Sequence, residues 1–68
     1  MKNIDYLTKE ASIIVNLYNG KRFSEAITKS KRAIKKFPDE ILLYNILSLS
    51  LSAENNNDEA IIYLNKAL

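Results

Sequence analysis

The sequence contains an internal repeat, in which residues 7–34 align with residues 41–68. Five of the 28 aligned pairs are identical, and conservative pairs fill in between them. The identical pairs are Leu17 and Leu51, Glu25 and Glu59, Ala26 and Ala60, Ile27 and Ile61, and Ala33 and Ala67. These positions have the spacing expected on the inner face of a helix. The repeat therefore indicates one domain, residues 1–68, with two divergent units over about residues 7–40 and 41–68.

Each unit contains two segments whose apolar residues recur at helical spacing. The spacing predicts four helices, over about residues 5–19, 24–36, 39–53 and 58–68. Gly20 is expected to adopt the positive φ that ends the first helix, and Pro38 is expected to stop the second. Ser24 and Asp58 are the expected N-caps of the second and fourth helices. The predicted fold class is all-α, with two antiparallel helix-turn-helix hairpins.

The apolar residues also predict which sides of the helices face inward. The expected inner positions are Leu7, Ala11, Ile14 and Tyr18 on the first helix, and Ala26, Ile27, Ser30, Ala33, Ile34 and Phe37 on the second. The fourth helix carries apolar residues at Ala60, Ile61, Leu64 and Leu68. The third segment is apolar almost throughout, and its residues 47–52 alternate as a strand does. We reject the strand interpretation, because the segment is long, poor in β-branched residues and flanked by helical patterns.

The repeat resembles the tetratricopeptide family, which has a period of about 34 residues and two helices per unit. The second unit is similar to the family pattern as Tyr44-x2-Leu47-Ser48-x2-Leu51 and Ala60-x3-Leu64-x2-Ala67, and the first unit closes with Ala26-x6-Ala33-x4-Pro38. The resemblance covers about residues 7–68. It implies two hairpins stacked side by side as a short right-handed α-solenoid.

Small side chains recur where the resemblance implies that two helices cross closely, since a larger side chain would force the axes apart. These residues are Ala26, Ala33, Ser48, Ala60 and Ala67. The chain departs from the family at Glu10, where a large aromatic residue is usual, and at Ile14, where a small one is usual. Asn57 stands where the first unit has Phe23, so the second unit lacks an apolar side chain at its turn.

The same resemblance implies a concave groove, lined by the first helix of each pair, that holds a peptide or a partner helix. Carried onto this sequence, the groove residues are Thr8, Ala11, Val15, Tyr18, Leu42, Asn45, Leu49 and Ser52. Asn45 offers a donor and an acceptor to a peptide backbone, or it is simply a solvated helix residue. The leucines have the alternative of packing against a neighbouring helix. No groove position is lysine or arginine, so a clamp for a C-terminal carboxylate is not expected.

Two further functions remain open from the sequence. The helix that covers the last repeat in the family is missing, and the uncovered Ile62, Leu64 and Leu68 predict self-association. Similar repeats also precede catalytic domains such as glycosyltransferases and sulfotransferases. The chain is accordingly also interpreted as part of a longer protein, in which it would be an N-terminal scaffold.

Residues 21–36 carry seven of the ten basic side chains. Lys29, Arg32 and Lys36 fall on one stripe, which is a pattern that nucleic acid, an anionic membrane or an acidic protein would fit. The net charge is only +2, and no aromatic residue is interleaved on the stripe for base stacking. We therefore expect a protein or peptide partner, not nucleic acid or a membrane.

The composition also limits catalysis. The chain has no cysteine and no histidine, and its adjacent carboxylates, such as Asp39 and Glu40, point about 100° apart on a helix. We expect no catalytic site, no metal site and no cofactor. Charged residues interrupt any secretory signal near the N-terminus, so a cytoplasmic location is expected.

Overall fold

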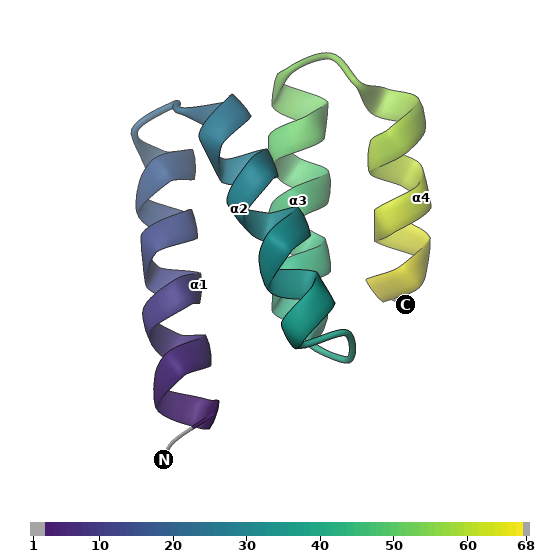
Figure 1. Ribbon diagram of the computed structural model, residues 1–68. Helices are drawn as coiled ribbons and strands as arrows, with labels where there is room; N and C mark the ends of the chain where they lie inside the picture. Colours follow the sequence, from purple (N-terminus) through teal and green to yellow (C-terminus); the bar gives the residue numbers. More distant parts are fainter. Residues whose placement is uncertain (1–2, 68) are drawn as a thin grey trace.

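The computed structural model describes residues 3–67, and within that range it consists of four helices and no strand. The helices are α1 (Asn3–Asn19), α2 (Phe23–Lys36), α3 (Ile41–Ala53) and α4 (Asn57–Ala67). They form two antiparallel hairpins, α1 with α2 and α3 with α4, and α3 also contacts α1 and α2 (Figure 1). The all-α prediction is confirmed, and residues 47–52 lie inside α3.

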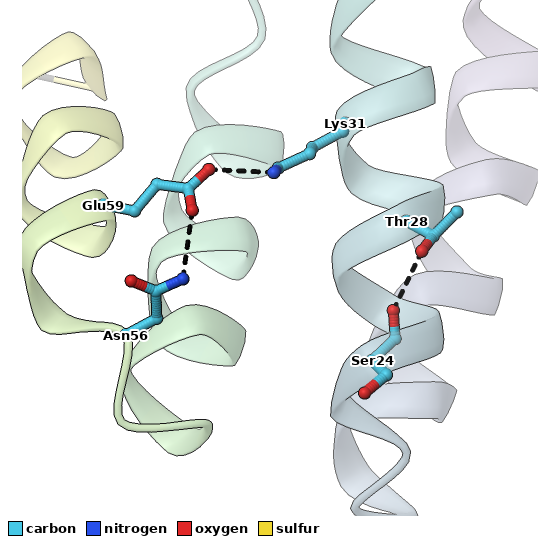
Figure 2. A network of polar contacts seen from close by, with 5 residues as sticks. All are labelled: Ser24, Thr28, Lys31, Asn56 and Glu59. Carbon is cyan, nitrogen blue, oxygen red and sulfur yellow. Dashed lines mark hydrogen bonds and ion pairs between the residues drawn. The ribbon is translucent and has the colours of Figure 1, made fainter.

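Both predicted N-caps are wrong. Helix α2 begins at Phe23, so Ser24 lies inside its first turn, where the Ser24 carbonyl accepts a hydrogen bond from Thr28 Oγ1 at 3.1 Å (Figure 2). The N-cap residue is Arg22, whose side chain makes no capping hydrogen bond. Helix α4 begins at Asn57, which places Asp58 in its first turn. There its negative charge still interacts favourably with the positive end of the helix dipole.

The turn after α1 does not use its glycine as predicted. The N–H of Lys21 donates to the carbonyl of Tyr18 at 3.0 Å, and the N–H of Arg22 donates to the carbonyl of Leu17 at 2.8 Å. This Schellman pair requires a left-handed residue two positions after the end of the helix. That residue is Lys21, with φ of 63°, and Gly20 has no positive φ. The expectation for Gly20 was therefore wrong by one residue.

The turn after α3 has the same bonding at the equivalent positions of the second unit. The N–H of Asn55 donates to the carbonyl of Ser52 at 3.0 Å, and the N–H of Asn56 donates to the carbonyl of Leu51 at 2.8 Å. Asn55 has φ of 65°, in keeping with the tolerance of asparagine for this region. The internal repeat thus extends from side chains to the backbone of both hairpin turns.

The core consists of two clusters joined through α3. The first brings α1, α2 and α3 together, and its buried members are Ile14, Ala26, Ala33, Leu43 and Ile46. The second is centred between α3 and α4, and its buried members are Leu47, Leu51 and Ala60. Ile34 of α2 packs against both clusters. The five small residues expected at helix crossings are all buried.

The apolar residues of α4 are only partly buried. Ile61 and Leu64 are 55% and 46% exposed, whereas Ala60 and Ala67 are buried and Tyr63 is half-buried. The rings of Tyr63 and Tyr44 stack with centroids 6.4 Å apart, which directs the tyrosine side of α4 toward α3. Leu68 lies outside the described residues. This orientation of α4 leaves the large aliphatic side chains of Ile61 and Leu64 on the open side of the second hairpin.

No helix within residues 3–67 is both long enough and apolar enough to cross a lipid bilayer.

Candidate protein-binding surface

The predicted groove residues divide between two surface hollows. Four of them line a hollow of about 390 Å³ between α1 and the start of α3: Thr8, Ala11, Val15 and Leu42. Glu40 also lines this α1–α3 hollow, and it brings a negative charge to the rim. Side chains of both hairpins therefore border one depression, as expected for a surface that spans two units.

Three other predicted residues lie in a larger hollow between α3 and α4, of about 550 Å³: Asn45, Leu49 and Ser52. The remaining predicted residue, Tyr18, lines neither hollow. Its ring packs edge to face on the ring of Phe23, with centroids 5.5 Å apart. The eight predicted residues are thus not brought into one groove, because seven of them divide between two hollows and Tyr18 lines neither.

The α3–α4 hollow has an apolar wall and no charged side chain in its lining. Leu49, Ile61 and Leu64 are each about half exposed. The floor is formed by the buried Ser48 and Ala60. Ser48 donates its hydroxyl proton to the carbonyl of Tyr44 at 2.6 Å, which satisfies that hydroxyl within α3. A half-exposed aliphatic wall over a satisfied floor favours an apolar, uncharged occupant.

A polar pair stands at the turn end of this hollow. The hydroxyl of Ser52 donates to Oδ1 of Asn57 at 3.2 Å, and both side chains line the hollow. In the internal repeat, the equivalent positions of the first hairpin are Tyr18 and Phe23. Two aromatic rings in contact in one hairpin are therefore replaced by two short, hydrogen-bonded side chains in the other.

Ile61 and Leu64 of α4 are the lining residues that the groove prediction missed. The repeat gives a signal for them, because they are the equivalents of Ile27 and Ser30 in the first unit. Ser30 is fully buried and Ile27 packs against the second core cluster. Positions that α3 helps to cover in the first hairpin are therefore open in the second.

The two hairpins are also joined by a charged contact. Lys31 Nζ of α2 lies 2.8 Å from a carboxylate oxygen of Glu59 in α4, and Nδ2 of Asn56 donates to the other oxygen at 3.1 Å (Figure 2). The hydrogen bond that Lys31 donates to Glu59 raises the pKa of Lys31 above its ordinary value of 10.5. Lys31 therefore contacts the second hairpin instead of serving only a solvated basic face.

The basic stripe on α2 faces a carboxylate of α1. Lys29, Arg32 and Lys36 line a small hollow of about 190 Å³ together with Glu10. Glu10 replaces the aromatic residue expected from the family pattern, so the departure places a negative charge beside the stripe. Within residues 3–67, no three histidine, cysteine, aspartate or glutamate side chains lie close enough to hold a metal ion.

Comparison of the chain with protein-family models, curated proteins and solved structures found no match. The internal repeat and the two hollows therefore carry the functional interpretation.

Proposed function

We propose that the chain is a protein-interaction module of the tetratricopeptide type, whose hairpins stack as a short right-handed α-solenoid and hold a segment of another polypeptide. The observation that carries the proposal is the pair of hollows on α1, α3 and α4, since seven of the eight predicted groove residues line one or the other. Concave, largely apolar surfaces with a few polar groups are the usual form of binding sites.

The repeated geometry supports this proposal. Equivalent turns end α1 and α3 with the same two hydrogen bonds, and the second helix of each hairpin begins three residues before an equivalent buried alanine, Ala26 or Ala60. In repeat proteins of this kind each unit contacts its neighbours, and the stacked units present an extended binding surface. Here α3 is the helix that joins the two units, because it contacts α1 and α2 of the first hairpin as well as α4.

The experiment is a selection from a phage-displayed random peptide library, followed by titration of the selected peptides. Leu49→Glu should weaken their binding about tenfold or more, because it places an unpaired charge in an uncharged hollow. Ile62→Glu is the control, since Ile62 is 54% exposed against 52% for Leu49 and lies outside both hollows. A library that yields no binder, or peptides that bind Leu49→Glu as tightly as the unchanged chain, would contradict the proposal.

Self-association is the second candidate function. Among the side chains that the structure describes, six of the seven exposed large aliphatic residues lie on α3 and α4: Ile41, Leu42, Leu49, Ile61, Ile62 and Leu64. The predicted self-association residues Ile62 and Leu64 are both in this set. Exposed aliphatic side chains gathered in one hairpin are typical of a surface that another protein covers. Sedimentation over a hundredfold concentration range tests this candidate, and a constant monomer mass throughout would exclude it.

A further inference from the structure

We propose that the α3–α4 hollow is the seat of an amphipathic helix from a partner protein, which lies on α3 and α4 as α3 lies on the first hairpin. We further propose that this helix brings an aromatic side chain to the Ser52–Asn57 pair. The inference rests on the proposed function, and it adds the chemical class of the partner and the residues that select it.

The first step is the equivalence between a covered face and an open one. In the first hairpin, Ile14 and Ala26 are fully buried in the cluster that they form with Leu43 and Ile46 of α3. The equivalent residues of the second hairpin, Ser48 and Ala60, form the floor of the α3–α4 hollow. The face of the first hairpin that α3 covers is therefore repeated on the second hairpin, where no helix among residues 3–67 covers it.

The second step concerns the apolar ridge of α3. Its Leu43 belongs to the first core cluster, and its Leu47 and Leu51 belong to the second, against which Ile27 and Ile34 of α2 pack. Helix α3 carries Leu43, Leu47 and Leu51 at intervals of four residues, and they are 0%, 0% and 2% exposed. Residues four apart lie on one side of a helix, so they form a continuous ridge. An occupant of the equivalent seat needs a similar ridge of large aliphatic side chains. Its ridge must also be uncharged, because no charged residue lines the hollow to pair with it.

The third step identifies the aromatic side chain. In the first hairpin, Tyr18 is packed against the core cluster and its ring meets Phe23. In the second hairpin, Ser52 and Asn57 occupy these two positions and leave the space of those rings open within a hollow of about 550 Å³. An aromatic ring from the partner would restore the missing contact, and a tyrosine hydroxyl would meet hydroxyl and amide groups at that end.

A second copy of this chain fits the seat less well. The helix equivalent to α3 is α1, and its residues at the ridge positions are Lys9, Ile13 and Leu17. Lys9 would bring a charge into an uncharged hollow, which costs free energy without a partner. Leu17 is already packed against the first core cluster. The geometry therefore favours a partner of different sequence.

The test uses the full chain and a set of fluorescein-labelled amphipathic helical peptides, each about 18 residues long so that it spans five helical turns. The parent peptide has leucine at every fourth position of an uncharged face, and in each variant one residue of that face is phenylalanine. At least one phenylalanine peptide should bind about tenfold more tightly than the parent, measured by fluorescence anisotropy. Leu64→Glu should abolish binding of all these peptides. Ile62→Glu, on the same helix but outside the hollow, should leave binding unchanged.

The selectivity is tested by giving the second hairpin the aromatic pair of the first. Ser52→Tyr with Asn57→Phe should remove the advantage of the phenylalanine peptide over the leucine parent. If the double variant does not fold by circular dichroism, Asn57→Phe alone provides the same comparison, because it fills one of the two ring positions. Retention of the full advantage in the folded variant would overturn the inference.

The other outcomes are separable. Equal binding of leucine and phenylalanine peptides, lost in Leu64→Glu, would overturn the aromatic selection and leave the proposed protein-binding function standing. A dimer that Leu64→Glu dissociates and Ile62→Glu does not would show a second copy in the seat and overturn the choice of partner. Failure of every helical peptide would overturn the inference even when displayed peptides bind elsewhere, and failure of both would overturn the proposed function too.

Discussion

Lys21 is the residue whose backbone conformation suits its side chain least. It has φ of 63° in the turn after α1, a region that costs an L-residue other than glycine about 1 to 2 kcal/mol. Lys21→Gly should therefore raise the free energy of unfolding by about 1 kcal/mol. Lys21→Ala removes the same charge and keeps the unfavourable φ, so it should give no such gain. Urea denaturation of both variants checks this, and equal stability of the two would contradict the explanation.

A buried hydroxyl at Ser30 gives a second residue-scale prediction. Ser30 is fully buried, and its Oγ is the one buried side-chain polar atom without a hydrogen-bond partner among the described residues. Ser30→Ala should stabilise the chain by about 1 kcal/mol, because it removes an unsatisfied polar group and improves helix propensity. The control is Ser50→Ala, since Ser50 is equally buried but donates to the Ile46 carbonyl at 2.8 Å. Thermal denaturation should show a higher midpoint only for the Ser30 variant.

At the scale of helices, the contact between Lys31 and Glu59 links α2 to α4. Its side chains are 43% and 30% exposed, so its contribution should be below about 1 kcal/mol. The pKa of Lys31 is raised in the folded chain. The contribution is therefore fully present below pH 10.5 and is lost as the pH rises through the higher folded value.

Glu59→Gln isolates this contribution. The difference in unfolding free energy between the unchanged chain and the variant should be positive at about pH 7 and should shrink toward zero as the pH rises through the raised pKa of Lys31. A difference that stays constant across this range would show that the lysine is not involved.

The positions of the helices can be predicted from the sequence. The side of α4 that faces α3 cannot be predicted in this way. Apolar spacing predicts all four helices, and Pro38 correctly marks the end of α2. In α4, the stripe through Ala60, Ile61 and Leu64 and the stripe through Ala60, Tyr63 and Ala67 both have helical spacing, so periodicity alone does not choose between them. Stacking of Tyr63 on Tyr44 makes the choice, and it depends on a residue of another helix.

The lining of the two hollows could be predicted only in part, for the same reason. Leu42, Asn45 and Leu49 were expected on the open side of the third helix, and the structure places them at hollows. The contribution of Ile61 and Leu64 depends on how α4 is rotated, which the sequence left undetermined. Tyr18 lies outside both hollows because its ring packs on Phe23, a contact across a turn that helical spacing does not report.

At the scale of the whole molecule, α3 is the element on which the others depend. It contacts α1, α2 and α4, whereas the backbone of α4 lies close only to α3 among the described helices. The amides of α3 should therefore exchange with solvent deuterium only through global unfolding, and those of α4 should exchange earlier through local opening. Native-state hydrogen exchange in low urea measures this order. Equal protection of α3 and α4 would show that the chain unfolds as one unit.

The up-and-down course of the four helices places the start of α1 and the end of α4 at one pole of the molecule, opposite the turns that follow α1 and α3 (Figure 1). Ser52 and Asn57 lie at the latter pole, on either side of the turn between α3 and α4. A chain tethered by either terminus to a bead, a membrane anchor or a larger domain would consequently hold Ser52 and Asn57 away from its support. Attachment would then leave approach from solvent unobstructed.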